Sequence, residues 1–276
     1  MRQPPEPRTG ADLLIDGERI HYVEQGDGDV IILIHGFPSS AQLTFGRLLP
    51  LLPLDRRVVA VDLVGLGWSD RGRQGAYDPA AQAPRILKVM DALEIGTATV
   101  VGSSFGGAVA QHLALLAPER IERLVLLASL DAHDPPRSWR KEFLFAGGIV
   151  ALLTAMRIPG LGRRLRCKVA KPYTGWTTDW DEHAAIDATE YTQLPGTARS
   201  ALKIMRDMAD ANSADTALIA APTLVISGSA DTRMPPSVGE AIAGNIPGAR
   251  HVVLTDCPHG LANHQPQNVA DFIVDR

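Results

Sequence analysis

The stretch VVGSSFGG, residues 100–107, places two adjacent serines between glycines directly after an apolar run. Gly102, Ser104 and Gly106 fit the pattern G-x-S-x-G, whereas a frame centred on Ser103 lacks both glycines. When a strand precedes this pattern and a helix follows it, the serine lies exposed on a strained turn. Larger side chains at the glycine positions would collide with the neighbouring strand and helix. The stretch therefore predicts a turn that exposes Ser104 as a nucleophile.

Apolar runs recur on both sides of this stretch. They are nearly continuous rather than alternating, which is typical of strands buried on both faces of a parallel sheet. They occupy residues 30–35, 58–64, 97–102, 123–129, 223–228 and 251–256. Helical patterns at 79–93 and 108–117 lie between runs, and Asp16-Gly17 predicts a hairpin before them. This alternation predicts an α/β fold with a mostly parallel, doubly wound sheet, whose functional loops follow the carboxyl ends of strands.

The alternation stops between residues 131 and 215, where helix starts are predicted near Asp134 and Thr178 but no strong strand pattern is found. We interpret this segment as a helical cap inserted into the core. The predicted domains are a first core part over 1–130, with a loose polar tail over 1–10, the cap over 131–215, and a second core part over 216–276.

The predicted cap has an ordered distribution of side chains. It is apolar from Phe143 to Met156, carries six basic residues and no acid over 157–171, and carries five acids and no base over 179–190. One interpretation is a cap helix that buries one side, followed by charged faces that pair with each other. A second is that the apolar segment lines a pocket for an acyl or aromatic group and moves as a lid. A third is an interfacial lid that contacts lipid.

The composition argues against several classes of function. The net charge of −4 leaves no basic surface of the kind that nucleic-acid binding requires. The two cysteines, Cys167 and Cys257, cannot form a disulfide framework, and their spacing fits no zinc site. The longest apolar stretch is shorter than the roughly 20 residues of a membrane span. We therefore expect no transmembrane segment, no metal and a cytoplasmic location.

The residues that could activate Ser104 follow two other predicted strands. Serine is a poor nucleophile on its own, so it needs a base, and the base needs an orienting carboxylate. His259 follows the last predicted strand and Asp231 follows the strand before it. Both should therefore lie with Ser104 at the same edge of the sheet, in the chain order Ser, Asp, His that accompanies this turn. Asp131, after the strand at 123–129, is the alternative acid.

Three further loops carry a resemblance that covers nearly the whole chain. HGFP (35–38) resembles the oxyanion loop of the α/β-hydrolase family, VDLVGLGWS (61–69) resembles its D-x-x-G-x-G-x-S loop, and GSADTRMP (228–235) resembles its acid loop. His259 and Pro266 keep the spacing of its C-terminal histidine motif. The resemblance implies the α/β-hydrolase fold with a helical cap.

The resemblance also implies roles for individual residues. The oxyanion hole should be the backbone N–H groups of Phe37 and Phe105. Asp231 is favoured over Asp131 because its loop matches more positions of the family pattern. Two positions depart from that pattern, because Pro258 stands where glycine is common and His264 where glutamate is common.

Two polar residues near the oxyanion loop have structural interpretations. His35 precedes the nucleophile in the chain, and we interpret it as a histidine bonded to backbone rather than as a base. Asp62 is interpreted as a brace between loops. The glycines at 65 and 67 do not form a dinucleotide fingerprint, because Asp70 occupies the third glycine position. No organic cofactor is therefore expected.

These observations predict a serine hydrolase that cleaves a carboxylic ester or a related acyl compound through an acyl-enzyme on Ser104. Its partner is a small acyl substrate of apolar or aromatic character. Family members that cleave haloalkanes or epoxides need an aspartate at the position that Ser104 occupies here. Hydrolases of carbon–carbon bonds in vinylogous diketones and cofactor-free perhydrolases remain alternatives with the same triad. A small-molecule receptor that retains the triad is the alternative outside the enzymes.

Overall fold

The structure is a computed structural model that describes residues 9–72, 75–133 and 190–275, and scattered positions from 148 to 165. The strands in these residues are β1 Ala11–Ile15, β2 Glu18–Gln25, β3 Asp29–Ile34, β4 Arg56–Val61, β5 Ala98–Ser103, β6 Ile121–Leu127, β7 Thr223–Gly228 and β8 Arg250–Leu254. The α-helices are α1 Ala41–Phe45, α2 Pro79–Ala92, α3 Phe105–Leu116, α7 Thr197–Ala209, α8 Pro236–Asn245, α9 Leu261–His264 and α10 Pro266–Val274. Short 3₁₀ helices are η1 Leu49–Leu51, η2 Pro118–Arg120, η3 Glu190–Gln193 and η4 Thr216–Leu218.

The strands form one eight-stranded sheet in the order β1-β2-β4-β3-β5-β6-β7-β8. From β4 to β8 all neighbours are parallel, whereas β2 pairs antiparallel with both β1 and β4. The predicted hairpin joins β1 to β2, and Asp16 and Gly17 both have positive φ, as a tight two-residue hairpin turn requires. The predicted α/β class with a mostly parallel sheet is confirmed.

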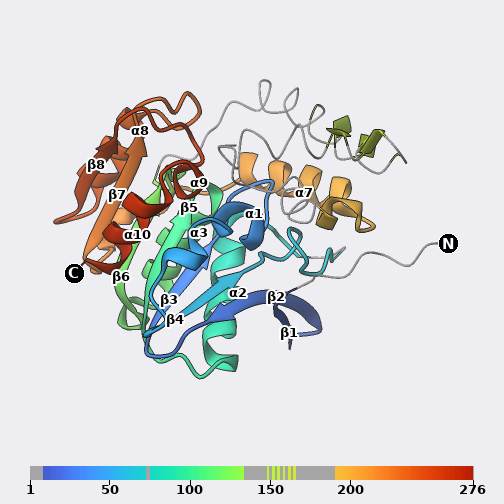
Figure 1. Cartoon of the computed structure of the whole chain (residues 1–276), viewed down its shortest axis with the longest axis horizontal. Coiled ribbons are helices and arrows are strands. Elements are labelled where there is room, and N and C mark those ends of the chain that lie inside the picture. The colour runs from blue at the N-terminus through green and yellow to red at the C-terminus, as the bar shows by residue number, and fades with distance from the viewer. Residues whose placement is uncertain are drawn as a thin grey trace.

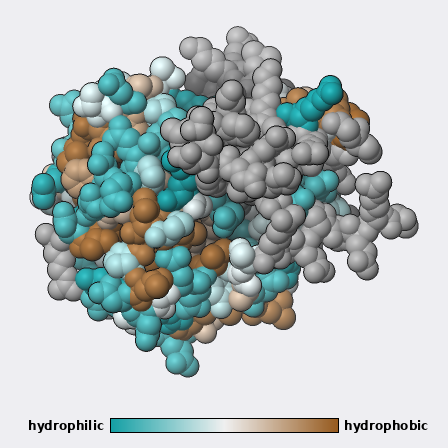
Figure 2. Space-filling view, in the orientation of Figure 1, coloured by the Kyte–Doolittle hydropathy of each residue, from teal (hydrophilic) through white to brown (hydrophobic). Residues whose placement is uncertain are grey.

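Helices cover both faces of the sheet (Figure 1). Adjacent residues of a strand point to opposite faces. Val100 belongs to the apolar cluster that includes residues of α2, α3 and α8, and Val101 to the cluster that includes residues of α1, α9 and α10. Both layers are apolar, which explains why the strand sequences are continuously rather than alternately apolar. The surface is mixed, with apolar patches between hydrophilic side chains on the face in Figure 2.

The predicted cap falls largely outside the described residues. That part of the chain includes the predicted helix starts near Asp134 and Thr178, the acidic stretch, and much of the apolar and basic stretches. Several described positions between residues 148 and 165 are helical, and residues 190–209 contribute η3 and α7. The boundaries of the predicted domains and the motion of a lid therefore stay predictions. Residues 1–8 of the predicted tail also lie outside the described residues.

Within the residues that the structure describes, none of the helices has the length and apolarity to cross a bilayer.

Candidate active site

The turn between β5 and α3 has the strained geometry that its sequence predicts. Ser104 has φ 53° and ψ −117°, a region that residues with a side chain rarely adopt. Its N–H donates to the carbonyl of Leu127 on β6 at 2.9 Å, and its carbonyl accepts from the N–H groups of Gly107 at 2.9 Å and Leu130 at 3.0 Å. Three backbone hydrogen bonds therefore hold Ser104 in a conformation that costs on the order of 1–3 kcal/mol.

The flanking glycines give the turn its clearance. A Cβ on Gly102 would lie 2.4 Å from the carbonyl oxygen of Gly106 in α3. A Cβ on Gly106 would lie 2.2 Å from the carbonyl oxygen of Ile34 in β3. Both contacts are with backbone atoms, which cannot move aside as the end of a flexible side chain can. The expected collisions with the neighbouring strand and helix are therefore the physical reason for glycine at both positions.

Three side chains from the ends of three strands form one hydrogen-bonded chain. Ser104 follows β5, Asp231 follows β7 and His259 follows β8. His259 Nε2 lies 3.0 Å from Ser104 Oγ, and His259 Nδ1 lies 2.7 Å from Asp231 Oδ2. The structure therefore brings together the three residues that the sequence singles out, in the arrangement that activates a serine.

The environment of Asp231 keeps it ionised. Its side chain is fully buried, and burial alone would raise the pKa of the carboxyl group. The hydrogen bond from His259 and those from the N–H groups of Met234 (3.0 Å) and Arg233 (2.8 Å) outweigh burial and lower this pKa below its usual value. An ionised Asp231 can only accept, so it favours the tautomer of His259 with the proton on Nδ1 and Nε2 free to accept from Ser104.

The alternative acid, Asp131, makes a local contact instead. Its Oδ1 accepts from the N–H of His133, two residues further on, at 2.8 Å. His259 Nδ1 is directed at Asp231. The geometry therefore favours Asp231 as the partner of His259.

The residues expected to supply the oxyanion hole lie on either side of Ser104. A Cβ on Gly36 would lie 3.2 Å from Ser104 Cβ, so the backbone that leads into Phe37 runs beside Ser104. Phe105 begins α3, where N–H groups have no partner within the helix. The two phenyl rings meet edge to face at 6.4 Å between centroids. A cavity of about 30 Å³, enough for one oxygen-sized group, adjoins Ser104, Gly36 and Phe37.

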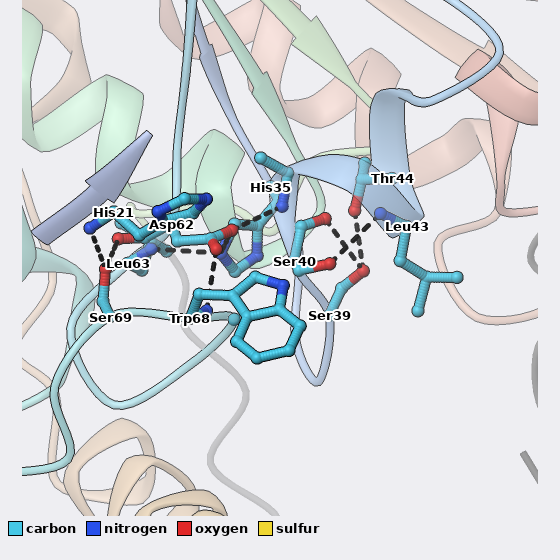
Figure 3. A network of polar contacts seen from close by, with 12 residues as sticks. His21, His35, Ser39, Ser40, Leu43, Thr44, Asp62, Leu63, Trp68 and Ser69 are labelled. Atoms are coloured by element: carbon cyan, nitrogen blue, oxygen red, sulfur yellow. Dashed lines mark hydrogen bonds and ion pairs between the residues drawn. The ribbon is translucent and has the colours of Figure 1, made fainter. Parts of the chain in front are cut away.

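Asp62 binds the loops behind this site. It is buried, and its carboxylate accepts from the N–H groups of Ala41 at 2.6 Å and Trp68 at 2.8 Å. Ser69 Oγ donates to the Asp62 carbonyl at 2.6 Å and accepts from the N–H of His21 at 2.9 Å. Figure 3 shows His21, Asp62, Trp68 and Ser69 of this network. Asp62 and Ser69 of the D-x-x-G-x-G-x-S pattern thus bind each other and neighbouring backbone.

The comparison with protein families decides the identity of the fold. A family model described as alpha/beta hydrolase fold matches residues 29–262, most of the chain.

The chain belongs to the α/β-hydrolase family.

Several members of the family resemble this α/β-hydrolase closely. It is 38% identical to 2-hydroxymuconate semialdehyde hydrolase of Pseudomonas putida over 130 aligned residues. The alignment covers 47% of this chain and 46% of that protein, so the match spans about half the length of this relative. It is 26% identical over 279 residues to soluble epoxide hydrolase of Corynebacterium sp. strain C12, with 95% of each chain covered. The solved structure of a meta-cleavage product hydrolase from Pseudomonas fluorescens matches with a TM-score of 0.77, 26% identity and 97% of each chain covered.

Arg71 connects the C-terminal part of the predicted cap to this α/β-hydrolase core, and no sequence pattern indicates this contact. Its Nε donates to Thr197 Oγ1 at 2.8 Å, and its guanidinium donates to the carbonyls of Gly67, Ser69 and Tyr191. Burial lowers the pKa of Arg71 to about 10, which leaves it charged at neutral pH. The contact joins residues more than a hundred positions apart, which no local pattern reveals.

We expect Arg71→Ala to destabilise the protein by about 2–3 kcal/mol, because it removes charge-assisted hydrogen bonds and leaves buried acceptors unpaired. Urea unfolding measures the difference. Lys88→Ala is the control, since Lys88 pairs with Asp16 on the surface and such pairs contribute about 0–1 kcal/mol. Equal midpoints for the two variants would contradict the assigned role.

An apolar cluster lies beyond Phe37. Its centre, Ala201 on α7, is fully buried, and half-buried apolar side chains pack around it: Phe37, Leu152, Leu165, Ala198 and Met205. Leu152 belongs to the apolar run predicted over 143–156. Leu152 and Phe37 therefore belong to one apolar cluster around Ala201.

The structure describes one of the two cysteines, Cys257, which is buried. Burial, with a smaller effect of Asp231, raises the pKa of the Cys257 thiol to about 11, so this neighbour of the acid loop stays protonated. No group of three or more metal-binding side chains is found in the part of the chain that the structure describes. Cys167 lies outside that part.

Proposed function

We propose that this α/β-hydrolase is a serine hydrolase that cleaves carboxylic esters or related acyl compounds through an acyl-enzyme on Ser104. The observation that carries the proposal is the continuous hydrogen-bonded chain from Ser104 through His259 to a buried, ionised Asp231. The strained turn supports it, because strain of this kind is retained where a side chain must be exposed for function.

The reaction divides into acylation and deacylation. His259 Nε2 takes the proton of Ser104 Oγ while this oxygen attacks the carbonyl carbon, and the carbonyl oxygen becomes negative. The N–H groups of Phe37 and Phe105 hold this oxyanion. The leaving group departs with the proton from His259. Water then gives a proton to His259 and attacks the acyl carbon, and Ser104 leaves with that proton.

The substrate is a small molecule with an apolar acyl part. The half-buried apolar side chains around Ala201 and Phe37 support this, since burying them against an acyl chain removes apolar surface from water. Each CH₂ group buried in such a pocket contributes about 0.8 kcal/mol. Affinity should therefore rise with acyl length until the pocket is filled.

A specific observation favours a second candidate, the hydrolysis of a carbon–carbon bond. The relative at 38% identity is named a 2-hydroxymuconate semialdehyde hydrolase, and the solved structure at 26% identity is named a meta-cleavage product hydrolase. In that reaction a proton has to be delivered to the leaving carbon, whereas in ester hydrolysis His259 delivers the proton to the leaving oxygen.

The two candidates are separated by turnover on matched substrates. We expect steady-state hydrolysis of p-nitrophenyl butyrate, with a lower KM than for p-nitrophenyl acetate because of the longer acyl chain. A vinylogous diketone formed by ring cleavage tests the second candidate, with loss of its absorbance as the measurement. A larger kcat/KM on the diketone would replace the ester proposal, and no turnover of either would favour a receptor.

A further inference from the structure

His35 is completely buried directly after β3, and both of its ring nitrogens contact backbone. Nδ1 lies 2.7 Å from the carbonyl oxygen of Gly36, and Nε2 accepts from the N–H of Leu63 at 3.1 Å. In Figure 3 the ring lies between the loop after β3 and the loop after β4, beside Asp62. The His35 ring therefore bridges the oxyanion loop and the D-x-x-G-x-G-x-S loop.

The two contacts determine where the proton of this ring sits. An amide N–H can only donate, so Nε2 has to be the unprotonated nitrogen. In the neutral ring the proton is then on Nδ1, which donates to the Gly36 carbonyl. Burial lowers the pKa of His35, against smaller opposing effects of Asp62 and Gly36, which favours the neutral ring. Asp62 Oδ1, 3.7 Å from Nε2, is therefore close to His35 without forming an ion pair.

The hydrogen bond to Gly36 has a consequence on the other side of the same peptide unit. The peptide bond between Gly36 and Phe37 is trans, since only the bond from Phe37 to Pro38 is cis within the described chain. In a planar trans peptide the C=O and the following N–H point in opposite directions. Holding the Gly36 oxygen on His35 therefore fixes the direction of the Phe37 N–H.

This peptide unit lies at the nucleophile. Gly36 is so close to Ser104 that an added Cβ would approach Ser104 Cβ to 3.2 Å. A rotation of the unit would turn the Phe37 N–H out of line with an oxyanion on Ser104, and donors of this kind act only when they are already aimed at the developing charge.

We propose that His35 is a positioning residue, which sets the orientation of the oxyanion amide of Phe37 through the Gly36 carbonyl. This inference rests on the proposed function, because the oxyanion matters only if Ser104 attacks a carbonyl. His35 itself touches neither the substrate nor the triad in this arrangement. Its effect should fall on kcat rather than on KM.

Two substitutions separate this role from a merely structural one. Asn places its amide nitrogen close to the position of Nδ1, so His35→Asn can still donate to Gly36 but loses the acceptor for Leu63. Gln places its amide close to the position of Nε2, so His35→Gln can accept from Leu63 but no longer reaches Gly36. Each variant keeps one of the two contacts, and melting temperatures report the cost to the fold.

We expect His35→Gln to lose about 10²–10³ in kcat on p-nitrophenyl butyrate with KM little changed, the usual loss for one oxyanion donor. Phosphonylation of Ser104 by a fluorophosphonate probe should slow in parallel. His35→Asn should keep most of kcat although its melting temperature falls. If kcat follows the melting temperature instead, or if both variants keep full kcat, the inference is wrong.

A measurement without turnover separates the inference from the proposed function. In ¹⁵N-histidine-labelled protein at pH 7, the ring shifts of His35 should show a protonated Nδ1 and an unprotonated Nε2. The opposite tautomer would overturn the inference whatever the activity. Failure of the probe to label Ser104 in the unsubstituted protein would overturn the proposed function and leave the tautomer of His35 to be decided by these shifts.

Discussion

Replacing Ser104 by alanine is expected to lower kcat on p-nitrophenyl butyrate by about 10⁴- to 10⁶-fold, because the substitution removes the atom that forms the acyl-enzyme. A fluorophosphonate probe should label the unsubstituted protein once per chain, at Ser104, and should not label Ser104→Ala. Mass spectrometry of the labelled peptide locates the adduct.

The chain provides a control one residue away. Ser103 is a serine in the same turn, but its neighbours in the sequence do not give it the glycine frame, and its side chain is outside the contact with His259. Ser103→Ala should keep labelling and activity close to those of the unsubstituted protein. Ester turnover that survives in Ser104→Ala, or labelling that moves to another residue, would show that Ser104 is not the nucleophile.

Asp231→Asn is expected to lower kcat by about 10⁴-fold while the fold is retained, as replacing the carboxylate of such a triad by its amide does elsewhere. An asparagine oxygen can still accept from Arg233 and Met234. Its amide group facing His259 would donate to Nδ1, which moves the proton of the ring to Nε2. The ring then cannot accept from Ser104. Steady-state kinetics together with urea unfolding measure the two effects.

Asp131→Asn is the matched control for this substitution. Asp131 accepts a short-range hydrogen bond from the N–H of His133, and an asparagine oxygen can accept the same bond. Its kcat should therefore be unchanged. If Asp131→Asn loses activity and Asp231→Asn does not, Asp131 is the acid and the contact between Asp231 and His259 serves only the fold.

Much of this fold could be predicted because local patterns determine it. Strands that pack on both faces have to be apolar at successive positions, as Val100 and Val101 are, and the glycines around Ser104 are needed for clearance. The sequence also placed Ser104, Asp231 and His259 each after a strand, and the carboxyl ends of parallel strands lie at one edge. Their proximity follows from topology rather than from any direct signal.

Other features could not be predicted because they depend on long-range packing. Asp131 and Asp231 both follow strands, so position alone left two acids open, and only the resemblance of its loop favoured Asp231. The direction of the His259 ring toward Asp231 is visible only in the structure. The bridge from Arg71 to Thr197 joins two loops without a pattern in either. The sequence predicted that His35 contacts backbone. That the contact is with the Gly36 carbonyl, in the peptide unit before Phe37, is visible only in three dimensions.

Strands β6 and β7 are neighbours in the sheet, although residues 128–222 lie between them in the chain. Leu124 pairs with Thr223 and Leu127 with Ile226, so β6 and β7 are parallel neighbours without a break in register. The register between β6 and β7 is therefore set by their own residues and not by the length of the segment between them. Sequence changes confined to that segment alter none of the residues that pair β5, β6, β7 and β8, the strands around Ser104, Asp231 and His259.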